Sequence, residues 1–171
     1  LLSGFAFRQK LTGSGDRQIL SMHIPGDILD LPSLFLRIAD HNVQMLTHGR
    51  VISIPHEALE RLALDYPAIG QAMWVDALID GSIFREWILN VGRRDARARI
   101  AHLLCEFAVR FQQAGLSDGD GDGYELPMTQ EQVADAVGLT PVHVNRTFKL
   151  LDGEGLISRN RRHVKIEDWD R

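Results

Sequence analysis

The chain has 171 residues, with 19 basic and 23 acidic side chains and a formal net charge of −4. This length allows one large domain or two small ones. The chain has no apolar run of about eighteen residues, and its first residues lack the charged start and cleavage site of a signal peptide, so we expect a cytoplasmic protein without a membrane partner. The single Cys105 can neither form an internal disulfide nor hold an iron–sulfur cluster alone.

The N-terminal third has the composition of a β-domain. Short segments with β-branched or alternating apolar residues, separated by Gly, Asp and Pro turns, predict strands at 5–11, 17–24, 43–47 and 50–54. A closed barrel needs about eight strands. Because the chain does not start with Met, we expect the remaining strands of this partial domain to precede Leu1.

Two helices are predicted next, a short one at 56–65 and a long one at 67–91. The long helix carries apolar residues on more than one side and must therefore be covered on more than one side. We expect one side to rest on the β-domain and another to pair with a second copy of the chain. A helix buried in its own core is the alternative, which is disfavoured because so small a domain cannot surround a helix of this length. The predicted dimer-interface residues are Ile79, Ile83 and Trp87.

Gly92 is expected to break this helix, and another helix is predicted at 95–114. Cys105 lies in its apolar pattern, which favours a buried inert thiol over the alternative of a redox switch. The acidic run at 118–123 matches the start of an EF-hand calcium loop. The twelfth position of that loop should be Glu but is Thr129, so a flexible acidic loop is the favoured interpretation.

The segment 129–152, TQEQVADAVGLTPVHVNRTFKLLD, has the pattern of a DNA-binding helix-turn-helix. Ala134 is small where the second helix should cross the first. Gly138 can adopt the positive φ that the turn requires. Val144 can bury the second helix against the first, so three steric requirements are met at the correct spacing.

Both helix starts are marked independently of the apolar pattern. Thr129 followed by Gln132 fits a capping box, in which the hydroxyl and the amide satisfy backbone groups of the first turn. Thr140 before Pro141 supplies an N-cap and a proline at the first helical position, where no N–H is needed. These caps predict two helices that begin at the expected places.

The second helix has two distinct faces. Its apolar residues Val144, Phe148 and Leu151 share one stripe, which must face the body of the domain. The other face carries side chains suited to base edges in the major groove, where Arg suits guanine, Asn suits adenine and Val can meet a thymine methyl. The predicted base-reading residues are Val142, His143, Asn145 and Arg146.

Residues 156–168 predict a β-hairpin with a basic tip, which would be the wing of a winged helix. Residues 141–166 contain six basic and two acidic side chains, a local net charge of +4 in a chain whose remainder carries −8. An acidic body with one basic tip favours a single face that docks on double-stranded DNA. Contacts with DNA phosphates are expected from Thr129, Thr140, Lys149, Arg159, Arg161 and Arg162.

Three alternatives compete with DNA binding. A winged helix used only for protein contacts would not need Asn145, Arg146 and Lys149 on one exposed face. A ligand-gated protein scaffold would keep the sensor fold without a DNA function. A cupin-type enzyme would bind a metal through histidines, but no His-x-His pair occurs. Its candidate ligands are His23, His41, His48 and His56.

From residue 25 to residue 168 the chain resembles bacterial transcription regulators of the Crp-Fnr family. The resemblance rests on PGD at 25–27, on REWILNVGRRDARARIAHLLCEF at 85–107 and on LTPVHVNRTFKLL at 139–151, of which the last is the most specific. It implies an α+β fold with a partial β-barrel or jelly-roll sensor domain of the cyclic-nucleotide-binding type, a long dimerisation helix and a C-terminal winged helix-turn-helix. The expected boundaries are 1–66, 67–92 and 93–171.

The resemblance also implies a function. It implies a sequence-specific transcription regulator, not an enzyme, that binds a palindromic site as a homodimer with its recognition helices about 34 Å apart. RNA polymerase is a further expected partner. No cofactor and no metal are expected, and the effector is unknown.

Two departures from the family pattern bear on ligand and target. Leu31 and His41 stand where nucleotide-binding members have Glu for the ribose and Arg for the phosphate. Leu31 cannot accept from a ribose hydroxyl, and a mostly neutral His41 poorly replaces a bidentate Arg, so we predict no binding of cyclic AMP. The reading helix begins with Pro141-Val142 instead of an Arg-Glu pair, so the target half-site should differ there.

Overall fold

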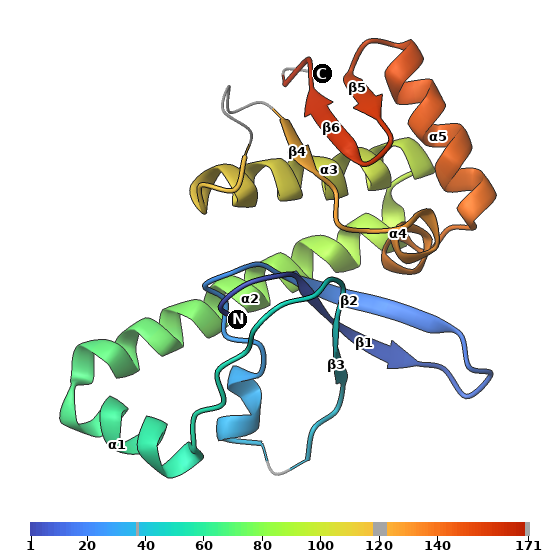
Figure 1. Ribbon diagram of the computed structural model, residues 1–171. Coiled ribbons are helices and arrows are strands. Elements are labelled where there is room, and N and C mark those ends of the chain that lie inside the picture. The colour runs from blue at the N-terminus through green and yellow to red at the C-terminus, as the bar shows by residue number, and fades with distance from the viewer. Residues whose placement is uncertain (37, 118–122, 170–171) are drawn as a thin grey trace.

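Strands, a long helix and a winged helix follow one another along the chain in the computed structural model (Figure 1). The structure describes residues 1–36, 38–117 and 123–169. No helix in these ranges is long and apolar enough to cross a membrane. The predicted α+β class is confirmed. The elements are β1 (Ala6–Leu11), β2 (Arg17–His23), the 3-10 helix η1 (Leu31–Leu34), β3 (Asn42–Met45), α1 (His56–Asp65), α2 (Pro67–Arg93), α3 (Ala96–Gln113), β4 (Gly123–Glu125), α4 (Gln130–Val137), α5 (Pro141–Gly153), β5 (Ile157–Asn160) and β6 (His163–Ile166).

The N-terminal strands form an antiparallel sheet in the order β2-β1-β3. The register of β1 with β2 shifts between Arg8 and Gln9, a local irregularity that bends a hairpin. Phe7 of β1 and Ile19 and Met22 of β2 are buried. These three side chains form the part of the core that the N-terminal sheet supplies.

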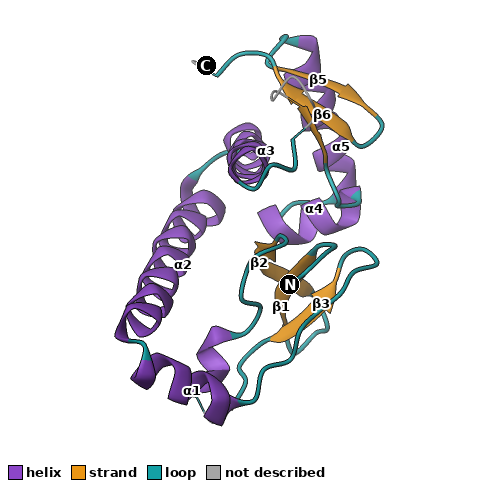
Figure 2. Cartoon of the chain, turned by 60° about the vertical axis from the view of Figure 1, so that its left-hand side comes forward, coloured by secondary structure: helices purple, strands orange, loops and turns teal. Residues whose placement is uncertain are grey.

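The helix α2 has 27 residues and runs along one side of the sheet (Figures 1 and 2). Only Met73 and Asn90 are buried among its residues. Its polar attachment to the sheet is made by Arg8, which is 3% exposed and forms an ion pair of 3.1 Å with Asp80. The rest of α2 keeps much of its apolar surface outside the core of this chain.

Two boundary predictions are wrong. The segment 50–54 is not a strand, because β1 already has a neighbour on each side and Arg50 makes only an isolated bridge with Ser3. Gly92 does not break α2, because a glycine costs a helix interior only about 1 kcal/mol relative to Ala. The helix ends instead where Arg94 adopts an extended backbone, with φ −78° and ψ 149°.

The predicted winged helix-turn-helix is present. It combines α3, α4 and α5 with an antiparallel sheet in the order β4-β6-β5. The rings of Phe107 and Tyr124 both pack edge-on to that of Phe111, with centroids 5.3 Å away. The Tyr124 hydroxyl donates to a backbone carbonyl of α3 at 2.7 Å. β4 was not predicted, because three residues are too few to show an alternating pattern.

The winged helix packs directly on the N-terminal sheet. Figure 2 shows α4 between that sheet and the rest of the winged helix. Arg17 of β2 forms an ion pair of 2.6 Å with Asp135 of α4, and Gln18 donates to an α4 carbonyl at 3.0 Å. Arg110 of α3 binds Asp27 at 2.6 Å. One continuous core of buried side chains therefore joins the two parts.

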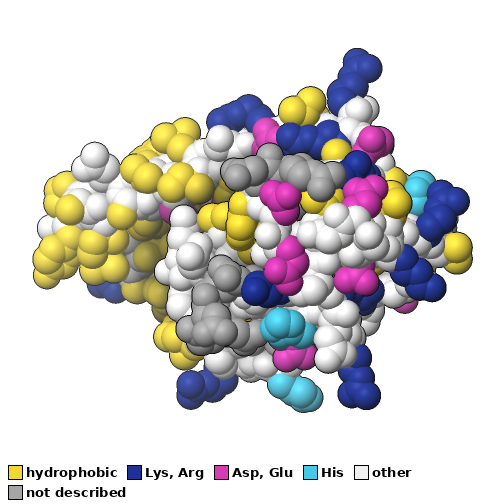
Figure 3. All heavy atoms as spheres, turned by 90° about the horizontal axis from the view of Figure 1, so that it is seen from above, with side chains coloured by type: hydrophobic (Ala, Val, Ile, Leu, Met, Phe, Trp, Pro, Cys, Tyr) yellow, Lys and Arg dark blue, Asp and Glu magenta, His cyan; other side chains and the backbone are white. Residues whose placement is uncertain are grey.

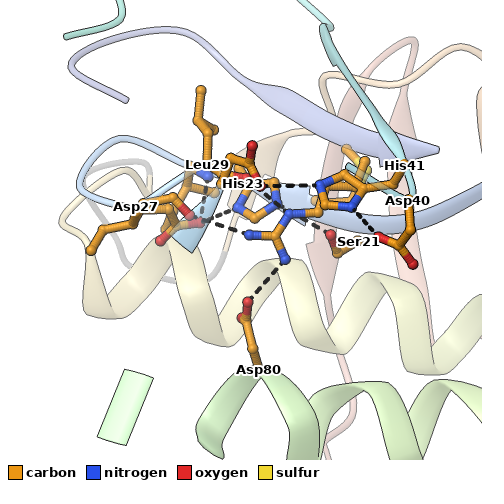
Figure 4. A network of polar contacts seen from close by, with 12 residues as sticks. Ser21, His23, Asp27, Leu29, Asp40, His41 and Asp80 are labelled. Atoms are coloured by element: carbon orange, nitrogen blue, oxygen red, sulfur yellow. Dashed lines mark hydrogen bonds and ion pairs between the residues drawn. The ribbon is translucent and has the colours of Figure 1, made fainter. Parts of the chain in front are cut away.

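Asp27 is the polar centre of this junction (Figure 4). Its carboxylate accepts from Arg110 and from the backbone N–H of Ile24 at 2.9 Å, and it lies 3.5 Å from Nδ1 of the buried His23. Burial alone would raise the pKa of Asp27, but the hydrogen bond with His23, the charge of Arg110 and the Ile24 N–H together lower it below 3.8. An ionised Asp27 is therefore part of the folded junction.

Candidate nucleic-acid interface

The helix-turn-helix is fixed by the caps that the sequence predicts. Thr129 Oγ1 accepts from the Gln132 N–H at 3.2 Å, and the Thr129 N–H donates to Gln132 Oε1 at 2.8 Å. Gly138 has φ 66°, the left-handed conformation that ends α4. Thr140 Oγ1 accepts from the His143 N–H at 3.3 Å and caps α5. The capping predictions are confirmed, and each threonine keeps a hydroxyl proton that it can donate.

The recognition helix α5 buries the predicted face. Val144, Phe148 and Leu151 are at most 2% exposed and pack on the other helices. On the opposite face Val142 is 80% exposed, and Arg146 is also exposed. The helix therefore presents a reading face that its own core holds in place.

The other predicted DNA contacts of α5 differ in exposure. The predicted base-reading residues His143 and Asn145 are half-buried, whereas Lys149, a predicted phosphate contact, is exposed. Asn145 Oδ1 accepts from Nε2 of Gln130 in α4 at 3.4 Å. Gln130 was not predicted, because no local pattern links residues so far apart in sequence.

The wing places two arginines at its tip. Arg161 has φ 56°, which is uncommon for a residue other than glycine. The carbonyl of Arg162 accepts from the Leu126 N–H at 2.8 Å and ties the tip to the segment after β4. Both arginine side chains are exposed, and neither forms an ion pair within the described part of the chain. Their charges are thus available to an anionic partner.

Arg159 is held differently from the tip arginines. Its guanidinium carbon lies 4.3 Å from the centre of the Phe148 ring, a cation–π arrangement. Its Nε is buried and has no hydrogen-bond partner among the residues that the structure describes. Burial lowers the pKa of Arg159, although the charge of Asp152 opposes this. Arg159 therefore links the wing to α5, and its predicted contact with phosphate stays a prediction.

Residues 98–171 match the Crp-like helix-turn-helix domain. The chain is 29% identical to the transcriptional activator protein FnrL of Cereibacter sphaeroides, over 100% of this chain and 69% of that protein. It is 26% identical to the fumarate nitrate reduction regulatory protein of Klebsiella oxytoca, over 98% of this chain and 66% of that protein. FixK2 from Bradyrhizobium japonicum has a similar fold, with a TM-score of 0.74 at 20% identity over 98% of this chain and 80% of that one.

These comparisons support a regulator of the Crp-Fnr family. The chain spans 69% of the length of FnrL and 66% of the length of the Klebsiella oxytoca protein, about two thirds of each. Members of this family are transcription regulators, so the chain is a DNA-binding regulator and not an enzyme. The cupin-type interpretation is therefore wrong.

Two of the four histidines of that interpretation, His23 and His41, have other partners in this chain. His23 lies 3.2 Å from the Ser21 hydroxyl and beside Asp27, and His41 Nδ1 lies 2.9 Å from Asp40. Within the described ranges no three His, Cys, Asp or Glu side chains are grouped to hold a metal. The acidic run at 118–122 lies outside the described residues. Burial raises the pKa of the Cys105 thiol, which disfavours the reactive thiolate.

The predicted dimer residues occupy different environments on α2. Ile79 is 54% exposed, and Ile83 is half-buried. Trp87 contacts α3 of the same chain, with Nε1 donating to Glu106 at 2.7 Å and the ring packing edge-on against His102. Burial raises the pKa of Glu106, although Arg110 and Trp87 oppose the shift. Trp87 thus has an intramolecular role that the sequence did not indicate.

The two positions that the resemblance relates to nucleotide binding carry Leu31 and His41. Leu31 is 7% exposed in the core beneath η1. The His41 side chain is 9% exposed and lies 3.6 Å from Asp30 as well as beside Asp40. Two carboxylates around His41 oppose the approach of a phosphate.

Proposed function

We propose that the chain is a homodimeric regulator that binds a palindromic site through two copies of α5, placed in successive major grooves about 34 Å apart. The reading face of α5 carries this proposal. Arg146 projects from a helix that Val144 and Phe148 fix from beneath, and guanine offers it two acceptors for a bidentate contact. Val142, His143 and Asn145 read neighbouring bases.

Phosphate contacts position the protein on the duplex. The tip of the wing carries Arg161 and Arg162 without intramolecular ion pairs in the described chain, and such charges give salt-dependent affinity. The helix α5 adds Lys149, and Arg159 lies between the two elements. The proposed phosphate contacts are Thr129, Thr140, Lys149, Arg159, Arg161 and Arg162.

The second copy is proposed to pack on α2. Val75, Leu78 and Ile79 lie on its outer surface, with exposed fractions of 48%, 64% and 54%. Figure 3 shows hydrophobic side chains gathered over the end of the molecule that α2 and α1 form. Exposed apolar surface of this extent marks an interaction site. Ile79 and Ile83 supply the centre of the interface, and Trp87 supplies the part of its ring that α3 leaves uncovered.

The proposed signal is not cyclic AMP. The side chains of Leu31 and His41 support this, because Leu31 has no polar group for a ribose hydroxyl and His41 lies beside the carboxylates of Asp30 and Asp40. Titration calorimetry of the chain with cyclic AMP should give no heat of binding at micromolar concentrations. A micromolar affinity would overturn this part of the proposal.

The regulator is proposed to act in the cytoplasm and to contact RNA polymerase. The relative FnrL is a transcriptional activator, and activation requires a contact between regulator and polymerase. The chromosome and the polymerase share the bacterial cytoplasm. In vitro transcription from a promoter that carries the selected site should increase when the chain is added.

Selection of bound sequences from a random duplex pool tests the proposal. The chain should enrich a palindrome whose half-sites are one helical turn apart. Arg146→Ala should weaken binding by about 1–3 kcal/mol and relax specificity at one base pair of each half-site. Arg61→Ala on α1, an exposed arginine outside the winged helix, is the matched control and should leave affinity unchanged. Uniform weakening by Arg146→Ala on all sequences would assign Arg146 to phosphate instead.

Sedimentation tests the dimer. Ile79→Glu would bury a charge in the proposed interface and should shift the chain toward the monomer, with a matching loss of affinity for the palindrome. Leu11→Glu is the control, because Leu11 is 58% exposed at the far end of β1. A dimer that survives Ile79→Glu unchanged would rule out this interface.

A further inference from the structure

The link between α2 and the winged helix is very short. α2 ends at Arg93 and α3 begins at Ala96, so only Arg94 and Asp95 lie between the two helices. Asp95 caps α3 by accepting from the Ala98 N–H at 2.8 Å. Each residue of such a link has two soft backbone dihedrals. The angle between α2 and α3 must therefore be fixed by contacts around the link.

Asn90 joins the end of α2 to both the link and α3. It is 0% exposed, and both ends of its side-chain amide have partners. Nδ2 donates to the Arg99 carbonyl at 3.3 Å, and Oδ1 accepts from the Arg94 guanidinium at 3.4 Å. A carbonyl only accepts and a guanidinium only donates, so a turned amide would lose both hydrogen bonds. The orientation of Asn90 is thus fixed by its partners.

Arg99 extends these contacts to the helix-turn-helix. Its Nε donates to the Arg94 carbonyl at 2.8 Å, and a terminal nitrogen donates to the Val137 carbonyl at 3.1 Å. Val137 is the last residue of α4, directly before the Gly138 turn. One side chain therefore holds both the link and the first helix of the helix-turn-helix. We call Asn90, Arg94 and Arg99 the hinge network.

We infer that the hinge network sets the angle between α2 and the winged helix, and thereby the spacing of the half-sites that the dimer accepts. In a two-fold dimer this angle places both copies of α5. Asn90 is buried within the single chain and is therefore not part of the exposed α2 surface proposed for dimerisation. The inference rests on the proposed function, because it requires a dimer on a palindrome.

The N-terminal sheet supports the winged helix from another side. Arg17 binds Asp135 of α4, and Asp27 binds Arg110 of α3. These contacts hold the winged helix to the sheet, whereas the hinge network holds it to α2, the helix proposed to carry the dimer. Loss of the hinge network should therefore relax the angle without releasing the winged helix.

Half-site spacing reports this angle directly. Two added base pairs move the second half-site by about 7 Å and turn it by about 70° around the duplex. A dimer with a fixed angle must distort or release one recognition helix, whereas a dimer with a relaxed angle can follow the displaced half-site. A role confined to the stability of the winged helix would weaken binding at both spacings alike.

Titration of the full chain on three duplexes tests the inference. The first carries the palindrome that the wild-type chain selects, the second carries it with two base pairs added between the half-sites, and the third carries one half-site. The spacing ratio is the affinity for the first duplex divided by that for the second. For the wild-type chain it should be about tenfold or more. Asn90→Leu keeps a branched side chain without hydrogen bonds and should lower it about threefold, with unchanged affinity for one half-site.

Two further variants and a control sharpen the test. Arg99→Met keeps an unbranched side chain without donors and should also lower the spacing ratio about threefold. The double variant should lose no more than the larger single loss, because the two residues act in one network. Arg93→Ala removes an exposed arginine beside the link and should leave the ratio unchanged. If Asn90→Leu does not fold, the half-buried Arg99 supplies the measurement.

The outcomes separate the inference from the proposed function. An unchanged spacing ratio in folded variants of the hinge network overturns the inference and leaves the regulator function standing. The same holds if Arg93→Ala lowers the ratio equally, if the wild-type chain binds both spacings alike, or if sedimentation shows that a variant has become monomeric. If the wild-type chain selects no sequence from a random duplex pool, both the inference and the proposed function are overturned.

Discussion

The winged helix and the α1–α2 region differ in how completely their apolar side chains are buried within the chain. In the winged helix, Leu104, Val133 and Phe111 are at most 1% exposed. In α1 no residue is buried, and in the 27 residues of α2 only two are. The winged helix closes its core within the chain, whereas α1 and α2 leave apolar surface exposed, which under the proposed function packs on a second copy. The difference separates residues that specify the fold from residues that are proposed to specify assembly.

The exposed surface of α1–α2 is rich in apolar side chains. Leu64, Trp74 and Ile88 are exposed by 79%, 69% and 69%. A cavity of about 710 Å³ lies between η1, α1 and α2, with Leu34, Met73 and Phe84 among its lining. Large apolar patches on a soluble domain mark binding surfaces. Substitutions in this region should therefore affect association more than the stability of the single chain.

The largest expected effect on stability comes from removing an aromatic ring from the buried core of the winged helix. Phe111→Ala should lower the free energy of unfolding by about 3–5 kcal/mol, because the cavity would adjoin the rings of Phe5, Phe107 and Tyr124. Trp74→Ala is the matched change on the exposed surface and should cost about 0.5 kcal/mol or less. Urea denaturation, at a dilution where sedimentation detects the single chain, measures both.

Equal losses from the two substitutions would contradict the comparison. They would mean that Trp74 belongs to a core of the single chain. A small loss at Phe111 would mean that the aromatic cluster collapses around the cavity. Near-ultraviolet circular dichroism distinguishes these cases, since it reports whether the remaining rings keep fixed packing.

The features that depend on residues close together in the chain could be predicted from the sequence. The caps at Thr129 and Thr140 and the turn at Gly138 involve partners within four positions, so their chemistry is readable locally. The buried stripe of α5 follows from helical periodicity. The recognition helix could therefore be placed almost to the residue before its structure was known.

The sequence could not predict contacts between distant elements. The Gln130 amide meets Asn145 only because the turn brings α4 and α5 together. Trp87 donates to Glu106 of the same chain because α3 folds back beside α2. The segment 50–54 has strand-like residues, but only Arg50 makes a bridge, with Ser3. In each case tertiary placement decides between uses that the same residue type allows.

An intermediate effect is expected at the junction between the N-terminal sheet and the winged helix. Asp27→Asn removes the charge that Arg110 and His23 face, and it should cost about 1–3 kcal/mol near neutral pH. Because the folded-state pKa of Asp27 is lowered from its ordinary value, its stabilisation is fully present above about pH 5. It is lost as the pH falls through the lowered pKa. The difference in stability between wild type and variant should therefore shrink in acid.

Urea titrations from pH 7 down to about pH 2.5 measure this difference. Asp65→Asn is the control, because Asp65 is exposed at the end of α1 and no junction contact involves it. It should show little difference from wild type across the range. A gap for Asp27→Asn that stays constant into acid would show that the junction depends on shape and hydrogen bonding, not on the ionised carboxylate.

The smallest expected effect is at the wing tip, where one substitution should raise the stability of the chain but weaken its binding to DNA. Arg161 at the wing tip has φ 56°, a conformation that costs an L-residue about 1 kcal/mol and glycine almost nothing. Arg161→Gly should therefore raise the free energy of unfolding by up to about 1 kcal/mol. It should also weaken DNA binding and reduce the slope of log affinity against log salt concentration by about 1, because one phosphate contact is lost.

Arg162→Gly serves as the comparison at the same tip, since Arg162 has no positive φ and should lose affinity without gaining stability. Thermal unfolding and salt-dependent DNA titration measure the two effects separately. A stabilised Arg161→Gly variant with unchanged affinity and salt slope would mean that Arg161 does not reach the duplex. The strained backbone of Arg161 would then have no explanation in DNA binding, and the proposed role of the wing would be restricted to Arg159 and Arg162.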